Sequence, residues 1–98
     1  MTSTTLTPGA GDYFISLSAT FEAANLDTHV VVSIYVNGVQ VSGSERRTEI
    51  RKNRFDSCFS QALVTGVTAG QAIEGRFRSL DGDSITMTNR SLVVIEID

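Results

Sequence analysis

Residues 12–23 read DYFISLSATFEA, and every second side chain in this stretch is apolar. The apolar series runs from Tyr13 to Ala23, while aspartate, serine, threonine and glutamate occupy most of the positions between. Successive side chains of a β-strand point to opposite faces, so this alternation predicts a strand with one buried face. Phe14 is the exception, because it is apolar and falls on the polar face.

A hairpin signal lies directly downstream of this strand. Residues 30–36 are β-branched and aromatic apart from one serine, and they end at Asn37-Gly38, after which Val39 and Val41 resume the alternation. Asn-Gly favours a type I′ turn because both central residues of that turn need positive φ. The sequence therefore predicts a hairpin here. Residues 42–56 are polar and charged and are interpreted as an extended edge strand or a long loop.

The rest of the chain repeats the same rhythm of short apolar runs and turns. Strands are predicted over 59–64, 71–78, 85–88 and 92–97, with a turn at 67–70 and a hairpin tip at Asp81-Gly82-Asp83. Roughly seven or eight short strands, spaced about 10 residues apart and without helical periodicity, are typical of a β-sandwich or jelly roll. The predicted class is all-β, a jelly-roll β-sandwich of short antiparallel strands.

The chain of 98 residues is interpreted as one domain, residues 12–98, preceded by a flexible arm at 1–11 that is rich in threonine and glycine. The arm has neither a basic start nor an apolar run, so we expect no signal peptide. No stretch approaches the roughly 20 apolar residues of a membrane span, so we expect no membrane partner. A chain this short buries only about 60 to 65% of its surface, which makes oligomerisation a serious option.

Two segments are apolar on both strand faces, residues 30–32 and 92–95. A free-standing antiparallel sandwich keeps one face of each sheet in water, so something is expected to cover the second face. A second copy of the same chain is the simplest cover, and it predicts a symmetric oligomer. The alternative is an ordinary exposed valine.

The composition argues against an enzyme and against a cofactor. Nothing in the sequence pairs Cys58, the single cysteine, with His29, the single histidine, as a nucleophile and its base. One cysteine and one histidine cannot make a zinc site within a subunit. The segment Asp81–Asp83 lacks the ligand count of a calcium loop and is better explained as a turn. No catalytic, metal or cofactor site is predicted.

The net charge of −3 argues against a surface built to neutralise nucleic acid, although one basic cluster stands out. It holds five of the 8 basic residues of the chain. Such a cluster is a candidate for binding an acidic protein surface. Phosphate contact is disfavoured because base-stacking aromatics are nearly absent there, and a solvated, charged sheet edge is the alternative. The cluster comprises Arg46, Arg47, Arg51, Lys52 and Arg54.

Four short motifs, taken in order, carry a resemblance to a known family. They are Gly11-Asp12-Tyr13-Phe14-Ile15, Tyr35-Val36-Asn37-Gly38-Val39, Leu63-Val64 with Gly70-Gln71-Ala72-Ile73, and Ser91-Leu92-Val93-Val94-Ile95. Their order and spacing from Gly11 to Ile97 resemble the C1q/TNF-like jelly-roll superfamily. The resemblance implies a tight homotrimer without catalysis, and the expected trimer interface includes Tyr13, Tyr35, Val93 and Ile95.

Similar domains serve bacteriophages, so the leading hypothesis is a non-enzymatic trimeric virion structural protein, assembled in the host cytoplasm. It would decorate or cap a phage capsid or appendage. Its partner would be the capsid or appendage protein. The arm would dock on that partner through Thr2, Thr4, Thr5 and Leu6. The alternatives are a receptor- or glycan-binding knob of a phage fibre that recognises its target through loops such as 42–56, or a C1q/TNF-like binding module.

Overall fold

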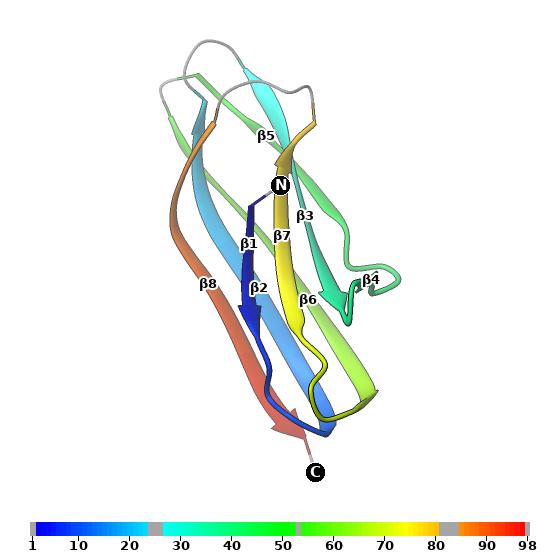
Figure 1. Ribbon diagram of the computed structural model, residues 1–98. Helices are drawn as coiled ribbons and strands as arrows, with labels where there is room; N and C mark the ends of the chain where they lie inside the picture. The colour runs from blue at the N-terminus through cyan, green and yellow to red at the C-terminus, as the bar shows by residue number, and fades with distance from the viewer. Residues whose placement is uncertain (1, 24–26, 53, 81–84, 98) are drawn as a thin grey trace.

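A computed structural model of the chain describes residues 2–23, 27–52, 54–80 and 85–97. Its strands form two antiparallel sheets packed face to face in an elongated body of 44 × 19 × 19 Å (Figure 1). The all-β class predicted from the sequence is confirmed as a β-sandwich. No helix in the described ranges has the length and apolar character needed to cross a membrane.

The described residues form eight strands, which pair in two sheets. Sheet A has the order β1-β7-β3-β4, and β5 pairs with β3 beside β4. Sheet B has three strands in the order β6-β2-β8. The strands are β1 (Thr2–Leu6), β2 (Gly11–Ala23), β3 (Thr28–Val36), β4 (Val39–Gln40), β5 (Arg46–Ile50), β6 (Phe55–Val67), β7 (Ile73–Ser79) and β8 (Ile85–Ile97).

The core lies between the sheets, and β2 supplies its centre, as the alternation predicted. Ile15, Leu17 and Phe21 are fully buried, and the residues between them face away from sheet A. Phe21 meets Phe77 of β7 with ring centroids 5.8 Å apart, a tilted arrangement that aromatic pairs favour. Burial of one whole face of β2 explains why the period-2 pattern in residues 12–23 is so regular.

The hairpin predicted at Asn37-Gly38 is confirmed. Both residues have positive φ, 51° and 80°, as a type I′ turn requires. The turn joins β3 to β4, and Tyr35 pairs with Gln40 across it.

The segment 85–97 is one strand rather than the two that were predicted. Asn89 adopts φ of 51°, and the register between β2 and β8 shifts between Ser18 and Thr20. A bulge of this kind absorbs an extra residue without ending the strand. The predicted hairpin tip at 81–83 lies outside the described residues. The prediction that the strands on either side of it pair as a hairpin is nevertheless wrong, because β7 belongs to sheet A and β8 to sheet B.

The flexible arm predicted for residues 1–11 is wrong for residues 2–6, which form β1. This strand pairs with β7 from Thr2 opposite Phe77 to Leu6 opposite Ile73. Without it β7 would have an unpaired edge, and edge amides and carbonyls are a ready template for another strand. The hydroxyl of Tyr13 then donates to the carbonyl of Gly9 at 3.0 Å, which fixes the passage from sheet A to sheet B.

Candidate functional site

The outer face of sheet A carries a row of polar side chains across four strands. Thr5 of β1 pairs with Glu74 of β7, Glu74 pairs with Tyr35 of β3, and Tyr35 pairs with Gln40 of β4. Directly paired residues share a face of a sheet, so these four side chains lie side by side. The row therefore presents donors and acceptors at a fixed spacing along the pairing direction.

Three residues in and beside this row form what we call the tyrosine cluster: Tyr35, Glu74 and Arg76. The guanidinium of Arg76 donates to the Glu74 carboxylate at 3.1 Å and lies 3.9 Å from the centroid of the Tyr35 ring. The side chains of Arg76 and Glu74 are 27% and 21% exposed, so solvent reaches both. The cluster combines an aromatic ring, a cation and an anion in one rigid contact set.

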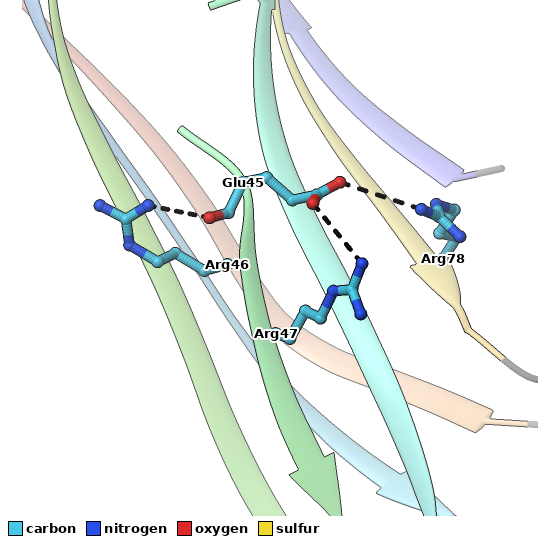
Figure 2. A network of polar contacts seen from close by, with 4 residues as sticks. All are labelled: Glu45, Arg46, Arg47 and Arg78. Atoms are coloured by element: carbon cyan, nitrogen blue, oxygen red, sulfur yellow. Dashed lines mark hydrogen bonds and ion pairs between the residues drawn. The ribbon is translucent and has the colours of Figure 1, made fainter. Parts of the chain in front are cut away.

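A second charged group lies further along the same face (Figure 2). The Glu45 carboxylate lies 3.9 Å from Arg47 of β5 and 3.9 Å from Arg78 of β7. Val31 of β3 pairs with both arginines and is only 2% exposed. Arginine stems cover apolar surface while their heads stay in water, so the second apolar face predicted at 30–32 is covered within the subunit.

The predicted basic cluster does not form one surface. Arg47 faces outward with Arg78, whereas Arg46 is its neighbour on the opposite side of β5 and donates to the carbonyl of Gly43 at 2.6 Å. The other members follow β5 as exposed residues in the connection to β6: Arg51, Lys52 and Arg54. Strand alternation places Arg46 and Arg47 on opposite faces of β5. The pairing of β3 with β7 brings Arg78, which is distant in sequence, to the face of Arg47.

The residues predicted for the trimer interface lie in three different places. Tyr13 is 4% exposed inside the sandwich core, so it offers almost no surface to a neighbour. Tyr35 belongs to the tyrosine cluster on sheet A. Val93 and Ile95 lie on the outer face of sheet B and are 44% and 54% exposed.

The predicted docking residues of the arm lie in β1, where Thr5 joins the polar row and Leu6 is 43% exposed. Thr2 and Thr4 pair through their backbones with Phe77 and Gly75 of β7. The arm is therefore part of the site's sheet rather than a free segment.

The two residues considered for thiol catalysis are not brought together. Cys58 is buried on the inner face of β6, opposite Ala19, whereas His29 is exposed on the outer face of β3 opposite Glu49. In the described ranges, no three metal-ligating side chains gather in one place. Asp81 and Asp83, weighed as calcium ligands, lie outside the described residues.

The sequence did not single out Glu74, Arg76 or Arg78 as site residues. They occur as alternate positions of β7, and only the pairing of β7 with β3 brings them to Tyr35 and Arg47. The one local signal is the Glu-x-Arg-x-Arg spacing of 74–78, which places all three on the same face of a strand.

Comparisons with known proteins bear on the fold. No protein-family model matches the chain, and no curated protein matches it. Among solved structures it is similar to the C-terminal domain of EclA, a sugar-binding protein, with a TM-score of 0.63 and 17% identity. The match covers 95% of this chain and 66% of that chain.

At this identity the likeness shows the fold alone. The resemblance to C1q/TNF-like proteins stays a prediction, because these findings give no evidence for it. The chain therefore has a β-sandwich fold like that of a domain from a sugar-binding protein.

Proposed function

We propose that this chain is a non-enzymatic carbohydrate-binding module that takes a saccharide on the outer face of sheet A. The observation that carries the proposal is the tyrosine cluster, in which Arg76 contacts both the Tyr35 ring and the Glu74 carboxylate. The fold that the chain shares with a domain of a sugar-binding protein adds support.

The chemistry of the cluster matches that of a sugar. A saccharide presents hydroxyl groups that both donate and accept, arranged around a ring with apolar C–H faces. The guanidinium of Arg76 has five N–H donors, the Glu74 carboxylate accepts, and the Tyr35 hydroxyl does both. The aromatic ring adds apolar surface, so one small area offers each kind of contact that a sugar ring needs.

The cluster is also held in place before any ligand arrives. Tyr35 and Glu74 are directly paired in the sheet, and Arg76 in the next row contacts both through the 3.1 Å ion pair and the 3.9 Å ring contact. Side chains that are already ordered lose less entropy on binding. Because an open sheet face buries little of a ligand, we expect weak binding per site, strengthened by several copies acting together.

A glycan array probed with the full chain, followed by titration of the saccharide that binds best, tests the proposal. Tyr35→Phe removes one hydroxyl and keeps the ring, and Arg76→Met removes the cation and keeps most of the stem. We expect Arg76→Met to weaken binding about tenfold or more, since it removes charge-assisted hydrogen bonds. Tyr35→Phe should weaken binding by a smaller factor, because it removes one neutral hydrogen bond.

Arg46→Met is the matched control, because it deletes an exposed arginine of the same sheet whose hydrogen bonds, among the described residues, go to backbone carbonyls. It should leave saccharide binding unchanged. If no saccharide binds on the array, or if Arg46→Met and Arg76→Met weaken binding equally, the proposed site is wrong.

A virion role stays a prediction, as do a capsid or appendage protein as partner and a receptor-binding knob on a phage fibre. The docking element assumed for that role includes Thr2–Leu6, which is a strand of sheet A. Deleting residues 2–10 and measuring incorporation into particles would therefore report on virion docking only if the truncated domain is first shown to keep its fold.

A further inference from the structure

The outer face of sheet B carries large apolar side chains that no described part of the subunit covers. Their exposed fractions range from 40% for Ile97 to 67% for Phe59. A single exposed apolar residue is ordinary on a protein surface, but a contiguous apolar face marks an interaction site. The face is contributed by Phe55, Phe59 and Leu63 of β6 and by Val93, Ile95 and Ile97 of β8.

These side chains form two ridges with a trough between them. The β6 ridge consists of Phe55, Phe59 and Leu63, and the β8 ridge consists of Val93, Ile95 and Ile97. The trough is the row Ser16, Ser18 and Thr20 of the central strand β2. The register places Ser18 between Phe59 and Ser91, and Ser16 between Gln61 and Val93. Phe59 and Val93 are thus the apolar walls of the trough, with Ser91 opposite Phe59 across Ser18 and Gln61 opposite Val93 across Ser16.

The trough is closed at one end by apolar residues. Phe14 of β2 pairs with Leu63 on one side and Ile95 on the other, so these three side chains form an apolar bar across the sheet. The charged residues of β2 on this face are Asp12 and Glu22, which lie at its two ends. The middle of the face therefore combines the small polar side chains of β2 with Phe59 and Val93, and β2 places no charge there for a strongly acidic or basic partner to recognise.

The size of the face is of the order that a protein interface needs. Three strands at a spacing of about 4.8 Å along the 44 Å body give a face of roughly 600 Å². Each partner in a standard interface contributes about 800 Å², and side chains that project from a sheet add area to its flat footprint.

We propose that this face binds a second copy of the chain about a two-fold axis, with the β6 ridge of each copy lying in the β2 trough of the other. The face supplies both halves of the fit, a ridge and a trough one strand apart, so the contact is reciprocal as two-fold symmetry requires. Val93 of the β8 ridge borders the trough at Ser16 and contacts the β6 ridge of the partner. Two such sheets pack about 10 Å apart, as within an ordinary sandwich.

Sedimentation velocity of the full chain from about 1 μM to about 500 μM tests the proposal, and a monomer–dimer equilibrium is the expected result. Phe59→Glu places a charge on the β6 ridge at a 67% exposed position, so the monomer fold tolerates it. It should raise the dimer dissociation constant by about tenfold or more. Val39→Glu is the matched control, because Val39 is 69% exposed on β4 of the other sheet, and it should leave the dissociation constant unchanged.

Ser18→Leu distinguishes the ridge-in-trough fit from general apolar adhesion. A leucine here fills the trough opposite Phe59, so the proposed fit predicts a weaker dimer even though the face becomes more apolar. A stronger dimer in Ser18→Leu would overturn the proposed fit. A wild-type chain that stays monomeric throughout, or forms a trimer as the C1q/TNF-like resemblance implies, would overturn the two-fold dimer.

Discussion

Gly75 of β7 lies directly against the side chain of Leu17 of β2, and this contact sets how closely the two sheets approach. A Cβ at Gly75 would fall 2.8 Å from Leu17 Cδ2 and 3.0 Å from Leu17 Cγ. Gly75 occupies a core-facing position of β7, and Leu17 is fully buried. The absent side chain on one sheet thus makes room for a large side chain on the other.

Gly75→Ala is expected to destabilise the fold by about 1 to 3 kcal/mol, because the added methyl group overpacks a filled core. Urea unfolding followed by circular dichroism measures the change. In a Leu17→Ala background the same substitution should cost less, since the truncated side chain leaves space for the methyl group. Equal costs in the two backgrounds would mean that Leu17 is not the obstacle.

Ser44 is expected to stabilise the passage from β3 into β5. Its buried hydroxyl accepts from the amide of Ile34 at 3.1 Å and donates to the carbonyl of Ile34 at 3.2 Å. Ser44→Ala would leave the buried Ile34 amide without this acceptor, while the Ile34 carbonyl keeps the Val41 amide, so we expect a loss of about 1 to 3 kcal/mol in the free energy of unfolding.

Ser42→Ala is the control for this substitution, because Ser42 is an exposed serine of the same connection. It should change the midpoint of urea unfolding very little. If the two alanine variants unfold at the same urea concentration, the Ser44 hydroxyl does not stabilise this passage.

Removal of residues 2–6 is expected to expose β7 rather than to release a dispensable arm. β1 pairs with β7 along all five of its residues, from Thr2 to Leu6. Amide hydrogen exchange should therefore speed up in β7, where amides lose their partners, while exchange in β2 at the centre of sheet B stays slow. Unchanged exchange in β7 of the truncated chain would contradict the assignment of β1.

The charged group around Glu45 is expected to contribute little to stability. Both of its ion pairs measure 3.9 Å, and the Glu45 and Arg47 side chains are 39% and 59% exposed. Exposed pairs of this kind are worth about 0 to 1 kcal/mol, so Glu45→Gln should shift thermal unfolding only slightly, and less in high salt. A large loss of stability in Glu45→Gln would show that the carboxylate organises the face above Val31.

Local patterns in the sequence determined the class of the fold and several of its parts. Alternation in residues 12–23 specified the buried face of β2, because a strand beside a core must place every second side chain inside. Asn37-Gly38 specified the β3–β4 hairpin, because those two residues tolerate the positive φ that the turn requires. Each of these signals depends only on neighbouring residues.

Only the tertiary structure decided which apolar residues face solvent and which charges meet. Val31 and Val93 both lie inside an apolar run, yet Val31 is covered by its paired arginines and Val93 stays exposed. The difference depends on the strands that lie beside them, which come from distant parts of the chain. Pairing of β7 with β3, and of β1 with β7, is long-range, and no window of adjacent residues contains it.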